Sequence, residues 1–147
     1  MNPVLSNEQA RLVDLLSINN KYISQEKLMD NAGMLSAQFF VEKIKDPFNK
    51  KVLVVAGKGN NGGDAIIMHH YLLHYGIDSN LFIVDRADKD LVNRYEISNK
   101  FIIDQINQET IRNYNWIIDG IFGIGLNQIV DGKYKKAIQV LNGQNII

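Results

Sequence analysis

The chain has 147 residues, of which 46% are hydrophobic and 22% are charged, so its length and composition are those of one folded domain with a substantial core. Its formal net charge of zero excludes a strong electrostatic basis for binding nucleic acid or an anionic membrane surface, and we expect neither as a partner. The absence of cysteine excludes disulfides, a thiolate zinc site and a cysteine nucleophile, and it fits the cytoplasmic location that we expect.

The part of the chain before the first predicted strand indicates two helices. Ser6, with Gln9 three residues later, forms a capping-box pattern, which predicts a helix that reaches about Ile18. Ser24 is the expected cap of a longer helix that reaches about Ile44. The apolar residues that lie roughly on one face of this second helix are Leu28, Leu35, Phe39 and Ile44.

A complete strand–helix–strand unit follows. Residues 52–56 form a continuous apolar run, as expected for a strand that is buried on both faces of a parallel sheet. A glycine-rich loop at 57–64 leads into a helix expected at 64–75, with Gly76 just beyond its end. Residues 81–84 are the second buried strand.

The second half continues the alternation of helices and strands. We expect a helix at 90–107, a strand at 116–119, a second glycine loop at 120–125 and a helix at 133–141. Residues 145–147 read as the start of another strand.

This order of elements predicts a Rossmann-like three-layer α/β/α sandwich with a mainly parallel sheet and additional N-terminal helices. Residues 1–147 read as one domain. Because the last expected strand stops after two or three residues, we expect this domain to be truncated and incomplete at its C-terminal side. Neither a signal-peptide pattern nor an apolar run near the roughly 18 residues of a membrane span is found.

The first glycine loop matches the dinucleotide-binding fingerprint at Gly57, Gly59 and Gly62, between a strand and a helix. Such glycines let the backbone approach a pyrophosphate at the positive end of the helix. Asp85, at the end of the second strand, could bind a ribose hydroxyl. The loop therefore also permits an NAD-binding oxidoreductase, or a tight turn without a ligand.

Polar side chains inside this loop point to a more specific site. Asn60, Asn61 and Asp64 supply amide and carboxylate oxygens, which are ligands for alkali or alkaline-earth cations. Each residue also has a purely structural explanation, because asparagines favour turn positions and Asp64 could cap the following helix.

Three segments together resemble one family. Residues 51–64, Lys-Val-Leu-Val-Val-Ala-Gly-Lys-Gly-Asn-Asn-Gly-Gly-Asp, are similar to the signature of the YjeF N-terminal domain, the NAD(P)HX epimerase family. Residues 28–33 resemble the second-helix motif of that family and residues 119–126 its third-strand motif, and all three occur in family order. The resemblance implies an isomerase that interconverts the R and S forms of hydrated NADH and NADPH (NADHX and NADPHX), with a fused or separate dehydratase as its companion.

The resemblance also implies site residues. Asn61 and Asp119 would bind a potassium ion, which would be the cofactor. The family's catalytic aspartate lies in an Asp-x-Pro-Ser-Gly motif beyond residue 147, so no catalytic residue is assigned. The family further implies a homodimer formed through the N-terminal helices. The substrate-binding residues would be Asn60, Asn61, Gly62, Gly63, Asp64, Gly123, Ile124, Gly125, Leu126, Asn127, Gln128 and Ile129.

Two other functions remain open. One is a non-catalytic Rossmann-like interaction or dimerisation module, against which the polar Asn-Asn-Gly-Gly-Asp loop argues. The other is the oxidoreductase, for which no hydride-transfer group is evident. His69, His70 and His74 lie close together on one expected helix, but without a third ligand they favour a packing face over a metal site.

Overall fold

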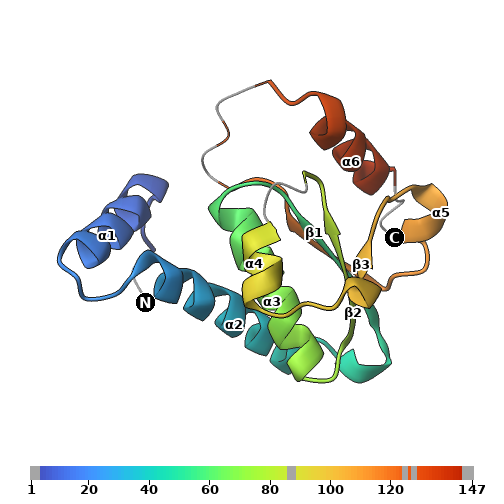
Figure 1. The fold of residues 1–147 in the computed structure, drawn as a ribbon, viewed down its shortest axis with the longest axis horizontal. Helices are drawn as coiled ribbons and strands as arrows, with labels where there is room; N and C mark the ends of the chain where they lie inside the picture. Colours follow the sequence, from blue (N-terminus) through green and yellow to red (C-terminus); the bar gives the residue numbers. More distant parts are fainter. Residues whose placement is uncertain (1–3, 86–88, 124–125, 127–128, 144–147) are drawn as a thin grey trace.

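A computed structural model describes residues 4–85, 89–123, 126 and 129–143, which form a four-stranded parallel sheet covered by helices (Figure 1). The helices are α1 (Asn7–Asn19), α2 (Gln25–Lys43), α3 (Asn60–His74), α4 (Lys89–Arg94), α5 (Gln108–Ile111) and α6 (Gly132–Asn142), with short 3-10 turns at Pro47–Asn49 and Asn99–Phe101. The strands are β1 (Lys51–Ala56), β2 (Asp78–Ile83), β3 (Ile102–Ile103) and β4 (Trp116–Gly120), in the spatial order β3-β2-β1-β4.

The apolar run of β1 is buried on both faces, which produces three layers. Val52, Val54 and Ala56 pack in a core with residues of α2 and α3. Leu53 and Val55 pack in a second core with residues of α5 and α6 on the opposite face of the sheet (Figure 1). The expected α/β/α sandwich with a parallel sheet is therefore confirmed.

The strands are aligned so that their carboxyl ends meet at one rim. Ala56, the last residue of β1, is paired with Gly120 on one side and with Ile83 on the other. Beyond the strands, the Gly57 N–H donates to the Gly120 carbonyl, 3.1 Å away, and the Val84 N–H donates to the Ala56 carbonyl, 2.9 Å away. The loops after β1, β2 and β4 consequently leave from the same edge, where open α/β sheets bind ligands.

The N-terminal helices have the predicted bounds to within a residue or two. The capping box of α1 is formed: Oγ of Ser6 accepts from the Gln9 N–H at 3.2 Å, and Oε1 of Gln9 accepts from the Ser6 N–H at 2.8 Å. Helix α1 nevertheless has no buried residue, and it projects from the body of the molecule (Figure 1).

The apolar face predicted for α2 is only partly turned inward: Ile44 packs against the core and Leu28 is half-buried. The buried residues of α2 are Gly33, Ala37 and Phe40, whereas Leu35 and Phe39 are 56% and 62% exposed. Small residues face α3 because the two helices approach closely: a Cβ on Gly33 would lie 2.6 Å from Cβ of Ile67. Leu35 and Phe39 therefore lie on the outer side of α2, while Phe40 packs into the core.

The prediction of a single helix at 90–107 is wrong, because this segment contains three short elements, which are α4, a 3-10 turn and β3. Helix α4 ends at Arg94, and Glu96 then adopts the left-handed conformation with φ of 49°, which a continuing helix does not allow. Ile102 and Ile103 form β3, which pairs with β2, and α5 begins only after it. The apolar spacing that indicated a helix comes from residues that contact the core from separate elements.

The strand expected at 145–147 lies outside the described residues. Within the part of the chain that is described, every helix is too short or too polar to cross a bilayer.

His69 is a fully buried polar residue of α3. Its Nδ1 lies 2.8 Å from Oγ of Ser79, and no partner is recorded for its Nε2 within the described residues. Burial, with a smaller contribution from His70, lowers the pKa of His69 to about 3. The imidazole is therefore neutral in the folded protein at neutral pH.

We expect His69 to contribute a loss of stability as the pH falls from about 6.5 towards 3, because the unfolded state binds a proton at His69 that the folded state rejects. The free energy of unfolding, measured by urea denaturation, should fall by up to about 1.4 kcal/mol per pH unit from this group. His69→Gln should flatten the profile, whereas His74→Gln, at an exposed position of the same helix, should leave the slope unchanged. Equal slopes in the wild type and His69→Gln would contradict this assignment.

Candidate functional site

The first glycine loop leads directly into α3. The helix begins at Asn60, not at Asp64 as expected, and its cap residue is Gly59, with φ of 98°. Asn60, Asn61 and Gly62 therefore lie in the first helical turn, whose backbone N–H groups have no acceptor within the helix. These N–H groups and the positive end of the helix dipole make this turn suited to a phosphate group.

Two glycines of the loop are required by close backbone contacts. A Cβ on Gly57 would lie 2.8 Å from the carbonyl carbon of Ile121, and a Cβ on Gly62 would lie 2.6 Å from that of Gly57. Neither position can accept a side chain, because the obstructing atoms belong to the backbone. The loop after β1 is thus packed directly on the loop after β4.

Asn61 joins these two loops through its side chain. Its Nδ2 donates to the backbone carbonyl of Phe122, 3.0 Å away. A Cβ on Gly123 would lie 3.3 Å from Cβ of Asn61, so this residue too lies against the amide side chain. With Nδ2 used in this way, Oδ1 of Asn61 remains available as an acceptor.

Asp119 lies near the end of β4 with an exposed side chain. Its Oδ1 accepts a hydrogen bond from the Ile121 N–H at 2.9 Å, so Asp119 does stabilise the turn that follows its strand. Asn61 and Asp119 therefore both contact the backbone of residues 121–122, at the same rim of the sheet. No group of three or more histidine or acidic side chains is arranged to hold a metal ion in the described ranges.

Asp64 is partly buried in the second turn of α3 and does not cap the helix. Its burial, and to a smaller extent the charge of Asp14 in α1, raises the pKa of Asp64 to about 6. A carboxyl group at this rim thus titrates close to neutral pH, where it can either release or accept a proton.

The remaining predicted site residues are only partly described. Asn60 is exposed, Gly63 is buried, and Leu126 and Ile129 are 50% and 93% exposed. Contact with a substrate stays a prediction for all of them. The predicted residues that lie outside the described part are Ile124, Gly125, Asn127 and Gln128.

Helix α6 contributes contacts to the site that the sequence did not indicate. The hydroxyl of Tyr134 accepts a hydrogen bond from the Lys58 N–H at 3.0 Å, and its ring stacks on Phe122. Nζ of Lys133 lies 3.6 Å from Oδ1 of Asp85. These pairs are far apart in sequence, and no local pattern could have revealed them.

Comparison with known proteins identifies the proteins that this chain resembles. Residues 25–147 match the model of the family described as YjeF-related protein N-terminus. The chain is 32% identical over 126 residues to an NAD(P)H-hydrate epimerase of Dictyostelium discoideum, with 81% of the chain aligned. It is 35% identical over 129 residues to a bifunctional NAD(P)H-hydrate repair enzyme of Dictyoglomus turgidum, with 82% aligned. A crystal structure of the yeast protein YNL200c superposes with a TM-score of 0.78 at 25% identity and covers 99% of the chain.

The chain spans only part of these proteins. It covers 53% of the Dictyostelium relative, 25% of the Dictyoglomus relative and 68% of the yeast structure.

We expect Asp64 to titrate at about pH 6 in a carboxyl NMR experiment, and Asp14→Asn to move this titration to lower pH by removing a nearby negative charge. The shift should be partial because burial is the larger cause. Since the folded state holds the Asp64 proton more tightly than the unfolded state, the contribution of Asp64 to stability should fall as the pH rises from about 4 to 6, which is opposite in sign to the contribution of His69. Asp64→Asn should remove this loss, so above pH 6 the variant should have a higher melting temperature than the wild type. A lower melting temperature of the variant above pH 6 would contradict this expectation, because it would show that other groups compensate the buried charge.

Proposed function

Because the chain belongs to the family of YjeF-related protein N-terminal domains, we propose that it acts as an NAD(P)H-hydrate epimerase, which interconverts the R and S forms of NADHX and NADPHX. The observation that carries this proposal is the pair of polar loops that Asn61 joins at the carboxyl rim of the sheet. Curated relatives named for this activity support it.

The substrate's pyrophosphate would bind at the first turn of α3. The N–H groups of residues 60–62 are available there, and glycines leave the backbone open to a ligand. The hydrated nicotinamide would then extend towards the loop after β4. Substrate contacts of the predicted residues in that loop belong to this proposal.

We further propose that Asn61 and Asp119 bind potassium. The available Oδ1 of Asn61 and the carboxylate of Asp119 are hard oxygen donors of low total charge, which fits an alkali cation better than zinc. Bound there, the ion would supply positive charge for the substrate's phosphates.

Epimerisation at C6 of the dihydronicotinamide requires a group that can transfer a proton. Asp64 has a pKa of about 6 and lies in the second turn of α3, next to the first turn that forms the proposed phosphate site, so it is suited to proton transfer near neutral pH. By resemblance, the family's catalytic aspartate would lie beyond residue 147, so Asp64 is a candidate for this step and no catalytic residue is assigned.

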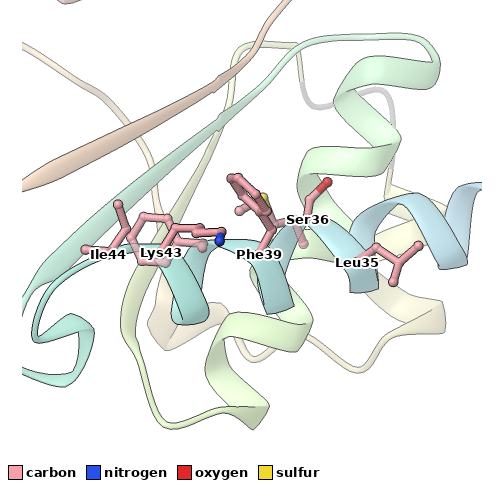
Figure 2. A pocket seen from close by; sticks show the side chains of 7 residues that line it. Leu35, Ser36, Phe39, Lys43 and Ile44 are labelled. Atoms are coloured by element: carbon pink, nitrogen blue, oxygen red, sulfur yellow. The ribbon is translucent and has the colours of Figure 1, made fainter. Parts of the chain in front are cut away.

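The surface of the N-terminal helices favours self-association. Helix α1 exposes about half or more of each of its apolar side chains Leu12, Val13, Leu15 and Leu16. Leu35 and Phe39 of α2, with Ile44 just after it, line a mainly apolar hollow of about 410 Å³ (Figure 2). Exposed apolar surface of this extent on adjacent helices is typical of an interface, and we propose a homodimer formed by these helices.

We expect the protein to restore NADH absorbance when it is added to R-NADHX and an S-specific dehydratase, at a rate above that without the protein. The rate should depend on potassium, and replacing potassium by lithium should lower it. Asp119→Asn should raise the potassium concentration for half-maximal activity about tenfold, as loss of one charged ligand predicts, while the turn to Ile121 can still form.

Asp78→Asn is the matched control, because Asp78 is an exposed aspartate at the amino end of β2, on the opposite rim. Its potassium response should equal that of the wild type. Absence of epimerisation in the wild type, assayed with the family's Asp-x-Pro-Ser-Gly segment present, would refute the proposed activity, and tight binding of undamaged NAD in its place would favour an oxidoreductase. An active enzyme that ignores potassium would refute only the ion site.

We expect the wild type to sediment with the mass of two copies at micromolar concentration. Leu12→Glu combined with Leu16→Glu should give a single copy with an unchanged circular dichroism spectrum, because the charges disrupt an apolar contact between copies. Asn7→Glu adds a charge to the same helix at a position that favours one, and it should remain dimeric. A wild type that sediments as one copy would contradict the proposal.

A further inference from the structure

Tyr134 is the residue through which α6 contacts both loops of the candidate site. Its hydroxyl oxygen accepts a hydrogen bond from the backbone N–H of Lys58, 3.0 Å away, in the loop after β1. Its ring stacks on Phe122 in the loop after β4, with ring centroids 5.2 Å apart and an interplanar angle of 29°. A single side chain is therefore joined to both loops.

The hydroxyl contact constrains the most flexible part of the glycine loop. Lys58 lies between Gly57 and Gly59, and Gly59 adopts a φ of 98° with open space where a side chain would be. Glycine has more backbone freedom than any other residue, so such a loop costs entropy to order. The hydrogen bond from Lys58 to Tyr134 limits this freedom before a substrate binds.

The ring contact extends the constraint to Asn61. Phe122 packs against Tyr134, and the carbonyl of Phe122 accepts the hydrogen bond from Nδ2 of Asn61. The position of Phe122 therefore determines where the Asn61 amide is held. Tyr134 thus acts on Asn61 through Phe122 and on the phosphate-binding turn through Lys58.

The hydroxyl also keeps a proton that it can donate. Its oxygen serves as the acceptor for Lys58, and no acceptor for the Tyr134 proton is recorded among the residues that the structure describes. Burial raises the pKa of Tyr134, so the proton is retained at neutral pH. A tyrosine in this state can stabilise the loop and still interact with a polar ligand.

Building on the proposed function, we propose that Tyr134 is a positioning residue that holds the two loops at the spacing that receives the pyrophosphate of NADHX or NADPHX. The pyrophosphate is remote from the C6 carbon that reacts. A loop that is less well ordered therefore weakens binding of the substrate and of the transition state equally, which raises KM and leaves kcat nearly unchanged.

The test is Tyr134→Phe, which removes the hydroxyl and keeps the ring that stacks on Phe122. In the coupled epimerase assay its KM should rise about five- to tenfold, as loss of one hydrogen bond predicts, while kcat stays within about twofold. Hydrogen exchange of the Lys58 amide, followed by NMR, should become faster than in the wild type.

Tyr114→Phe is the matched control. The Tyr114 hydroxyl donates to Oδ1 of Asn80 at 3.0 Å, and its ring lies beside Lys51 at the start of β1, at the rim opposite the site. This variant loses a comparable tyrosine hydrogen bond, so the melting temperature should fall without a change in KM or in Lys58 exchange.

The outcomes separate this inference from the proposed function. If the wild type is active and Tyr134→Phe has an unchanged KM or unchanged Lys58 exchange, the positioning role is wrong and the epimerase function stands. The same KM increase in both tyrosine variants would indicate a general loss of stability and would also overturn it. A wild type that does not epimerise NADHX would refute the function itself, and with it any substrate role for Tyr134.

Discussion

The packing of the loop after β1 on the loop after β4 is the constraint on which the candidate site depends. Gly57 lies against the backbone of Ile121, and Gly62 lies against the backbone of Gly57. These contacts leave no room for a side chain, so the backbones of the two loops meet directly at Gly57 and Ile121. The side chains of Asn61 and Asp119, which lie next to this contact, are therefore held in one small region at the rim.

The sequence predicted most of the fold because its signals are local. Burial on both faces gives β1 an uninterrupted apolar run, and the caps of α1 and α2 lie within three residues of the positions they satisfy. Strand β3 could not be predicted, because two residues carry no period and its partners on β2 are distant in sequence. The inward face of α2 was missed because small residues, which add little to an apolar pattern, make its closest contacts.

The candidate site likewise has one part that the sequence predicted and one part that it did not. The glycine loop could be identified because its residues are consecutive and have known conformational requirements. Contacts across the fold could not be identified from the sequence, because they join residues of separate elements. Examples are the hydrogen bond between Tyr134 and Lys58 and the effect of Asp14 on the pKa of Asp64. The start of α3 at Asn60 was also missed, because glycines at 62 and 63 are poor helix formers. They are tolerated in the helix because neighbouring atoms lie too close for larger residues.

The motif at residues 28–33 makes packing contacts and hydrogen bonds that join α2 to the rest of the fold. Sδ of Met29 lies 2.6 Å from where a Cβ of Gly63 would be, so this side chain covers the first turn of α3. Oδ1 of Asp30 accepts hydrogen bonds from the hydroxyls of Tyr95 and Tyr71, at 2.9 and 3.0 Å. Desolvation opposes the charge of Asp30, but these hydrogen bonds and Lys27 outweigh it and lower the pKa of Asp30, so the carboxylate stays ionised. The motif thereby fixes α2 to α3 and to the end of α4. Because α3 carries Asn61 and Asp64, a helix that contributes no predicted ligand determines where the groups of the site are held.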